Sequence, residues 1–219
     1  MLRLYVMLGA PGAGKGTQAT ILARLLGIPH VASGELFRAA VRDRTPLGLQ
    51  AAADMERGAL VSDELVIRLV LDRLAQPDTA EGAILDGFPR TRPQAEALDA
   101  ELATHGAKVS GALYVEVHEE ELLRRLSGRW LCRESGHSYH VVDHPPKHAG
   151  ICDFDGSELY QRDDDRPATV RVRLDRQLAP MYEVVDHYRG CGMLSAVNGE
   201  QPIEAVTEAL LRAIAQPAH

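Results

Sequence analysis

The chain has 219 residues, with 24 Lys or Arg and 31 Asp or Glu, so its formal charge is −7. At roughly 150 residues per domain, this length corresponds to one or two domains. The content of hydrophobic residues (45%) and charged residues (25%) excludes an intrinsically disordered chain. The acidic balance argues against bulk electrostatic binding of nucleic acid or an anionic membrane, but it allows a local basic site.

The sequence shows neither a membrane span nor a disulfide framework. No apolar run approaches the ~20 residues that cross a bilayer, and the run Leu4–Leu8 is too short for a secretory signal. The three cysteines, Cys132, Cys152 and Cys191, are an odd and sparse set. We therefore expect a protein of the reducing cytoplasm.

Short apolar runs alternate along the chain with segments of helical period. The pattern predicts strands at residues 2–8, 30–32, 83–85, 112–117 and 193–197. It predicts helices at residues 15–26, 35–42, 47–57, 63–74, 93–103, 119–126 and 167–188. Ser62 is a favourable N-cap, and Pro93 suits the first position of a helix. This alternation predicts an α/β fold with a parallel sheet covered on both faces.

Residues 128–165 differ in composition and periodicity from the rest of the chain. They are rich in Gly, Pro and His, contain two of the cysteines and show no sustained helical period. The run at residues 138–142 reads as a strand, so the segment is predicted to be a small β-rich insertion.

The strongest chemical signal is Gly9–Thr17, which reads GAPGAGKGT and joins a predicted strand to a predicted helix. In a phosphate-binding loop, small residues let backbone N–H groups surround the phosphates, and the helix N-terminus adds partial positive charge. Lys15 would reach the outer phosphates. Because Gly16 follows Lys15 and the hydroxyl comes only at Thr17, direct Mg²⁺ ligation by that hydroxyl departs from the usual pattern. The alternative is a glycine-rich turn that closes a strand–helix unit.

A second motif follows the predicted strand at residues 83–85. Asp86 ends that strand, where a carboxylate can hold a metal-bound water beside phosphates; the alternative is a turn or N-cap aspartate. Arg90 follows Gly87, Phe88 and Pro89, a rigid turn that can aim a guanidinium at phosphate. Phe88 and Pro89 could equally serve packing.

Together these motifs resemble the nucleoside monophosphate kinases, and the adenylate kinases in particular. The glycine-rich loop has that family's form, and Ser33–Arg38 resembles its monophosphate-binding segment. Asp86–Thr91, followed by Gln94, matches its most specific signature. The match continues through residues 128–129, 138–140, 162–165 and Arg173. It covers nearly the whole chain, and the insertion is similar to that of the long-lid subclass.

The resemblance implies a three-layer α/β P-loop NTPase fold with a parallel sheet, a helical segment that binds the nucleoside monophosphate and a small β-rich lid. The core would comprise residues 1–32, 62–127 and 166–219, the monophosphate-binding segment residues 33–61, and the lid residues 128–165. The implied activity is transfer of the γ-phosphoryl group of MgATP to AMP, which gives two ADP reversibly. The implied state is a cytoplasmic monomer without nucleic-acid or membrane partners.

The resemblance also implies two nucleotide sites. It assigns to ATP Gly12, Ala13, Gly14, Lys15, Gly16, Thr17, Arg125, Arg129, Ser138, Tyr139 and Gln201. It assigns to AMP Ser33, Arg38, Ala59, Leu60, Val61, Gly87, Phe88, Pro89, Arg90, Gln94, Arg162 and Arg173. It assigns to catalysis Lys15, Arg90, Arg129, Arg162, Arg173, Asp164 and Asp165. The two aspartates would orient arginines, Asp86 would hold a water of Mg²⁺, and the cations fit a reaction that spreads negative charge over phosphate oxygens.

Without the resemblance, several of these side chains have structural interpretations. Scattered arginines such as Arg125 are usually solvated, and a solvated helix residue is the default for Gln94. Ser33 could cap a helix as well as touch phosphate. Residues 163–165 could be an acidic cluster at a helix N-terminus.

The insertion holds a possible zinc site. In many long-lid relatives, four cysteines at the matching places bind zinc, whereas others use a polar hydrogen-bonded cluster. Here Cys132, Cys152 and Asp155 can ligate zinc, Ser135 is a poor ligand, and His137 is near enough in sequence to be the fourth. Structural Zn²⁺ that stiffens the lid and a metal-free cluster both stay open.

Other functions remain as alternatives. The acceptor could be another nucleoside monophosphate, or the donor could be GTP. A P-loop ATPase or switch protein would hydrolyse its nucleotide without an acceptor. A zinc-finger-like nucleic-acid module is opposed by the net charge of −7 and by the incomplete ligand set.

Overall fold

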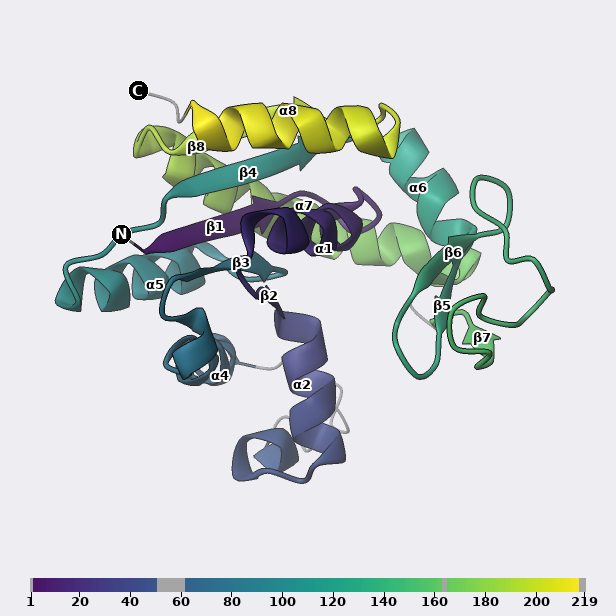
Figure 1. The fold of residues 1–219 in the computed structure, drawn as a ribbon, viewed down its shortest axis with the longest axis horizontal. Helices are drawn as coiled ribbons and strands as arrows, with labels where there is room; N and C mark the ends of the chain where they lie inside the picture. Colours follow the sequence, from purple (N-terminus) through teal and green to yellow (C-terminus); the bar gives the residue numbers. More distant parts are fainter. Residues whose placement is uncertain (1, 51–61, 163–164, 217–219) are drawn as a thin grey trace.

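A five-stranded parallel sheet forms the centre of the molecule (Figure 1). The structure, a computed structural model, describes residues 2–50, 62–162 and 165–216. The strand order is β2-β3-β1-β4-β8, and every pairing is parallel. The strands are β1 (Arg3–Leu8), β2 (His30–Ala32), β3 (Gly82–Asp86), β4 (Gly111–Glu116) and β8 (Leu194–Asn198). The predicted α/β class and all five predicted strands are confirmed, with ends that differ by at most one residue.

Helices surround this sheet (Figure 1). They are α1 (Lys15–Leu26), α2 (Ser33–Arg42), α4 (Asp63–Leu74), α5 (Arg92–Thr104), α6 (Glu119–Ser127), α7 (Pro167–Gly190) and α8 (Ile203–Ala215), with a short 3₁₀ helix at Pro77–Thr79. Helix α1 contacts α8, while α5 contacts both α4 and α7. Among the described helices, none is both long enough and apolar enough to cross a bilayer.

The predicted helices need several corrections, among them two-residue extensions: α2 begins at Ser33 and α7 ends at Gly190. Helix α8 was not predicted, although Val206 and Leu210 place apolar side chains on its buried face. Helix α5 begins at Arg92, so Pro93 takes the second position and Thr91 is the N-cap. Of the helix predicted at 47–57, residues 46–50 are helical and the remainder lies outside the described residues. The predicted cap at Ser62 is confirmed, because its Oγ accepts from the Leu65 N–H at 3.4 Å.

The core of the large sheet is aliphatic, as expected for parallel strands covered by helices. In β1 and β3, Val6, Ile84 and Leu85 are fully buried, and they join one continuous cluster with residues of the surrounding helices. The register pairs Met7 with Asp86 and Asp86 with Ala32. The chain segments that follow β1, β2 and β3 therefore leave the sheet at the same edge, which is where α/β proteins bind ligands.

Residues 128–165 contain a second, antiparallel sheet, called here the small sheet. Its strands are β5 (Arg129–Cys132), β6 (Ser138–His140) and β7 (Leu159–Tyr160), in the order β6-β5-β7. The predicted β-rich character is confirmed, although the strand predicted at 138–142 ends at His140. Cys132, Tyr139, Cys152 and Leu159 form its buried core. Figure 1 shows the small sheet set apart from the large one, beyond α6.

Candidate active site

The glycine-rich loop joins β1 to α1 at the carboxyl edge of the large sheet. Gly12 has φ 85°, and a Cβ there would lie 2.9 Å from Leu126 Cγ. Gly14 occupies the N-cap of α1 with φ 93°. Both positions favour glycine because L side chains rarely adopt positive φ. A glycine cap leaves the first N–H groups of α1 free of side-chain partners, so they can bind an anion.

Lys15, the first residue of α1, lies beside this loop. Its Nζ donates to the Ala10 carbonyl at 2.9 Å. Burial lowers the pKa of Lys15 to about 8; the negative charge of Asp86 opposes this shift, and the charges of Arg90, Arg129 and Arg173 add to it. Four cations from separate parts of the chain therefore converge, an arrangement that favours a multiply charged anion.

Asp86 lies at the end of β3, next to the loop. Its Oδ2 is 3.4 Å from His30 Nε2, and it would lie 3.3 Å from a Cβ placed on Gly16. Burial opposes ionisation of Asp86, but the hydrogen bond with His30 and the charge of Lys15 outweigh it, so the pKa of this carboxyl lies below its ordinary value. Asp86 is thus an ionised carboxylate beside the loop, and the absence of a side chain at Gly16 makes room for it.

The turn after β3 brings Ser33 and Arg90 together. Gly87 has φ 73°, and a Cβ there would lie 3.0 Å from both Arg90 Nη2 and Ser33 Oγ. Its carbonyl accepts from Arg90 Nε at 2.7 Å and from Ser33 Oγ at 2.6 Å. The N-cap of α2 is Ala32, so the expectation that Ser33 caps this helix is wrong. The peptide bond between Phe88 and Pro89 is cis, and Phe88 is buried.

Gln94 is buried rather than solvated, because it is only 3% exposed. Its Oε1 accepts from the Arg90 backbone N–H at 2.8 Å, and its Nε2 donates to Asp63 Oδ1 at 2.7 Å. The default interpretation as a solvated helix residue is therefore wrong. The side chain instead links the turn that carries Arg90 to the start of α4.

Asp165 joins two of the predicted arginines. Arg129 Nε and Nη2 donate to the two Asp165 oxygens at 2.9 and 2.7 Å, and Arg173 Nη1 donates to Oδ1. The Asp165 side chain is fully buried. The fork-shaped contact fixes the orientation of the Arg129 guanidinium, and Asp165 also holds Arg173 through Nη1. Arg129 belongs to β5 and Arg173 to α7, so this carboxylate connects the small sheet to the core.

The chain is similar to known proteins over almost its full length. A family model described as adenylate kinase matches residues 7–193. The chain belongs to the adenylate kinase family. Three proteins named adenylate kinase illustrate the similarity. That of Carboxydothermus hydrogenoformans is 48% identical over 213 residues (97% of this chain and 99% of the relative). Those of Brevibacillus brevis (201 residues; 92% and 94%) and Streptomyces avermitilis (210 residues; 95% and 96%) are each 47% identical.

The other residues expected from the family resemblance are more scattered. Arg125 Nε donates to Glu121 Oε1 at 2.7 Å on α6, and the Arg38 guanidinium lies over Gly34 of α2. Arg162 follows β7, and Gln201 lies in the exposed turn before α8. Ala59, Leu60, Val61 and Asp164 lie outside the described residues.

Tyr139 and Ser138 lie on β6, in the small sheet. Tyr139 is 2% exposed; its hydroxyl accepts from the Asp153 N–H at 2.7 Å and donates to Cys152 Sγ at 3.4 Å. Its side chain therefore stabilises the interior of the small sheet. Ser138, in contrast, is exposed.

Four potential metal ligands gather in the small sheet. Cys132, His137, Cys152 and Asp155 each offer one ligand atom, and these four atoms lie within 4.8 Å of one another. Cys132 Sγ is 3.0 Å from Asp155 Oδ2, and His137 Nδ1 is 3.3 Å from Cys152 Sγ. Two sulfurs, one imidazole and one carboxylate suit tetrahedral zinc.

The pKa values in this cluster also favour the binding of a cation. Burial raises the pKa of the Cys132 thiol, but hydrogen bonds from Ser157 and from the Ser135 backbone N–H outweigh it and bring the pKa to about 7. The hydrogen bond from Cys132 is the largest of the causes that hold the pKa of Asp155 far below its ordinary value. Ser135 thus contributes its backbone N–H to the thiol, and His137 completes the set of four ligand atoms.

Two polar residues in the site were not predicted. His30 contacts Asp86, and Asp63 binds Gln94. In the sequence, His30 is only a polar residue in a three-residue strand, and Asp63 reads as a favourable charge at a helix N-terminus. Their partners are 56 and 31 residues away in the sequence, so no local pattern could have revealed these contacts.

Proposed function

We propose that this protein transfers the γ-phosphoryl group of MgATP to AMP and yields two ADP in a reversible reaction. The observation that carries the proposal is the convergence of Arg90, Arg129 and Arg173 on Lys15 at the glycine-rich loop. Phosphoryl transfer needs little covalent assistance from the protein, because positioning and electrostatic stabilisation supply most of the catalysis. Membership of the adenylate kinase family supports the same activity.

The donor nucleotide would occupy the loop. Backbone N–H groups of Gly12–Thr17 would bind its phosphates at the start of α1, and Lys15 would pair with the outer phosphate. Arg125, Ser138 and Gln201 would line the remainder of this site, with Tyr139 supporting β6 from inside. Asp86 would hold a water molecule of Mg²⁺, and the bound ion would neutralise charge on the donor phosphates.

The acceptor AMP would lie across the edge of the sheet, beside the turn that follows β3. Arg90, Arg38 and Arg162 would bind its phosphate, Ser33 would hold the turn, and Gln94 would pair with the base. Residues 59–61, which the family resemblance assigns to AMP, would complete this proposed site. The α-phosphate oxygen of AMP would then attack the γ-phosphorus in line, and the β–γ bridging oxygen of ATP would leave as part of ADP.

Arg129 and Arg173 would stabilise the charge that spreads over the transferred group, with Asp165 and Asp164 orienting them. Neither a covalent enzyme intermediate nor a protein general base is needed. Residues 33–61 and 128–165 would act as two covers on the core formed by the rest of the chain. Closure would exclude water, which otherwise competes with AMP as the nucleophile. We expect the protein to work as a monomer in the cytoplasm.

We further propose that the cluster in the small sheet binds one structural Zn²⁺. Cys132, His137, Cys152 and Asp155 would be the ligands, and the metal would crosslink the end of β5 and the loop after it to the loop before β7. The support is the convergence of four competent ligand atoms from these two segments. A metal-free cluster held by hydrogen bonds is the alternative, and metal analysis of the purified protein separates the two.

A panel of nucleoside monophosphates assayed with MgATP tests the proposed reaction. We expect diphosphate formation to be fastest with AMP and to yield two ADP for each ATP consumed. Faster reaction with another monophosphate would identify that nucleotide, and not AMP, as the acceptor. Phosphate release that is independent of any monophosphate would instead identify an ATPase. Replacing ATP by GTP in the same assay tests the donor.

A further inference from the structure

Asp63, the first residue of α4, binds two side chains at the start of α5. Its Oδ1 accepts from Gln94 Nε2 at 2.7 Å, and its Oδ2 accepts from Thr91 Oγ1 at 2.9 Å. The opposite end of the Gln94 carboxamide is also bound, because its Oε1 accepts from the Arg90 backbone N–H at 2.8 Å. Gln94 is thus held at both ends in a position where it is only 3% exposed.

These two partners determine which way the Gln94 carboxamide points. An ionised carboxylate only accepts hydrogen bonds, and a backbone N–H only donates them. A half-turn of the amide would place its NH₂ group against the Arg90 N–H and its oxygen against the Asp63 carboxylate. Both contacts would then be repulsive. The chemistry of Asp63 and Arg90 therefore permits a single orientation of Gln94.

A fixed carboxamide distinguishes between two kinds of purine. After the bonds to Asp63 and Arg90, the amide still has one N–H and one oxygen lone pair to offer a ligand. A 6-aminopurine presents an acceptor at N1 beside a donor amino group, whereas a 6-oxopurine presents a donor N1–H beside an acceptor oxygen. The two edges require opposite orientations of the amide. A carboxamide that cannot turn over therefore matches only one of them.

We infer that Asp63 is a positioning residue that makes the acceptor site select a 6-aminopurine over a 6-oxopurine, because it locks the orientation of Gln94. This inference rests on the proposed function, since it takes the Gln94 carboxamide to pair with the acceptor base. Asp63 acts through Gln94 and need not touch the nucleotide.

Asp63→Ala tests the inference by removing the acceptor at Gln94 Nε2. We expect the preference for AMP over IMP, measured as the ratio of kcat/KM values, to fall roughly tenfold, as for the loss of one hydrogen bond to a charged group. The change should appear mainly in the KM for AMP, while the KM for MgATP stays at the wild-type value. Asp63→Asn should restore most of the preference, because its amide can accept from Gln94 and donate to Thr91.

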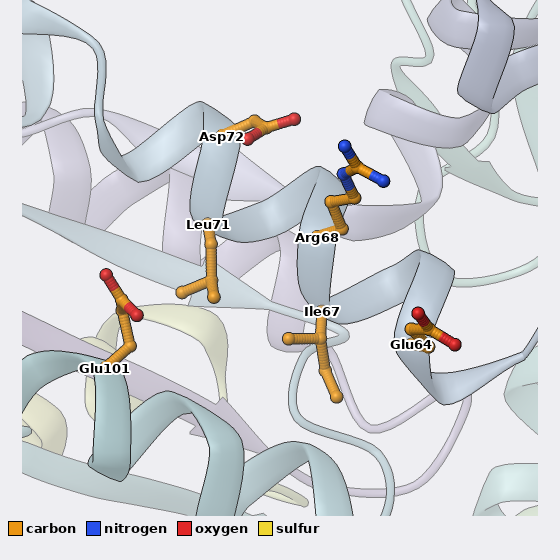
Figure 2. A pocket seen from close by; sticks show the side chains of 6 residues that line it. All are labelled: Glu64, Ile67, Arg68, Leu71, Asp72 and Glu101. Carbon is orange, nitrogen blue, oxygen red and sulfur yellow. The ribbon is translucent and has the colours of Figure 1, made fainter.

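Glu64→Ala is the matched control. Glu64 is the next residue in the same first turn of α4, so the variant removes an equal charge from the same helix N-terminus. Glu64 lines a groove between α4 and α5 together with Ile67 and Leu71 (Figure 2). It is exposed. We expect Glu64→Ala to keep the wild-type preference for AMP.

The outcomes separate this inference from the proposed function. If the wild-type protein does not phosphorylate AMP, the proposed function fails. If it does, but Asp63→Ala keeps the wild-type ratio of AMP to IMP, or Asp63→Asn loses it as fully as Asp63→Ala, the inference about Asp63 is wrong. Thermal denaturation shows which variants fold. Should Asp63→Ala not fold, Asp63→Ser decides the question in the same way, because serine suits helix starts but its side chain is one bond shorter.

Discussion

The two sheets of this molecule are stabilised by different interactions. Every residue of β1 from Leu4 to Leu8 is buried, within an aliphatic core to which residues of the surrounding helices also contribute. The core of the small sheet contains Cys132, Tyr139, Cys152 and Leu159, with Trp130 packed against it. At about 1.5–3 kcal/mol for each large buried side chain, so few residues supply little stability. The small sheet therefore depends more heavily on its polar and thiol contacts.

This difference fits the separate tasks that we propose for the two parts. A phosphate loop must hold its N–H groups and Lys15 in place, and a large apolar core provides that rigidity. A cover must open and close, and regions with few buried apolar contacts open at low free-energy cost. The two parts meet at Asp165, where one buried carboxylate binds Arg129 of the small sheet and Arg173 of α7. Charge thus contributes to the connection between them.

Lys15→Ala is expected to have the largest effect, and it acts within the rigid part. Removing the cation that we propose to pair with the outer phosphate should lower kcat/KM by about 10²–10³-fold. The melting temperature should change little, because the substitution costs the fold the hydrogen bond from Lys15 Nζ to the Ala10 carbonyl, which is a small loss. Arg24→Ala, in the last turn of the same helix, is the control, since Arg24 is exposed. A Lys15→Ala enzyme with near-normal turnover would remove the loop from the mechanism.

Asp165→Asn breaks the connection between the two parts. Loss of the charge leaves Arg129 and Arg173 without their shared counter-ion, so we expect unfolding in urea to become easier by about 3 kcal/mol. Bound nucleotide should recover part of that loss, because phosphates would replace the carboxylate. Urea titrations with and without a non-hydrolysable ATP analogue measure both effects. Equal stability of the variant and the wild type would show that the ion pairs contribute nothing net.

Removal of a metal should weaken the small sheet and spare the large one. After treatment with a zinc chelator, we expect faster hydrogen exchange across residues 129–160 and unchanged exchange in β1 and β3. Cys152→Ala should reproduce this pattern, whereas Cys191→Ala, which alters an exposed cysteine outside the cluster, should not. Elemental analysis that finds no zinc in freshly purified protein would instead support the hydrogen-bonded cluster.

The pH dependence of MgATP binding should be the smallest effect. Burial lowers the pKa of Lys15 from 10.5 to about 8, so the amine loses its charge as the pH rises through about 8. The KM for MgATP should then increase, by at most about tenfold for each further pH unit. The free energy of unfolding should rise over the same range, because the unfolded chain binds this proton more tightly between pH 8 and 10.5, and its loss from the folded state relieves the burial of a charge. Lys15→Met should abolish the increase.

The sequence predicted most of the fold, and it named residues that the structure brings together beside the glycine-rich loop, for identifiable reasons. Buried parallel strands are continuous apolar runs, so all five strands of the large sheet were recognised. The glycines of the glycine-rich loop are required by the local backbone conformation, so a short pattern in the sequence is enough to predict the loop. Helix α8 was missed although its apolar residues recur at helical spacing. Without the family resemblance Gln94 reads as a solvated residue, because a polar residue on a helix gives no sign of a buried partner.

The order of residues along the chain determines where each residue falls within a strand, a helix or a loop, because backbone preferences and the burial of apolar side chains act over a few residues. It therefore placed Lys15 in the glycine-rich segment, and Asp86 and Arg90 at the end of a strand and in the turn after it. The family resemblance already linked Asp165 to arginines and His137 to the two cysteines, but the geometry of these contacts, and the whole pairing of Gln94 with Asp63, arise only in the folded molecule. Each depends on a distance of a few ångströms between segments brought together by packing. Hydrogen bonds and ion pairs need that precision, and no pattern in the sequence encodes it.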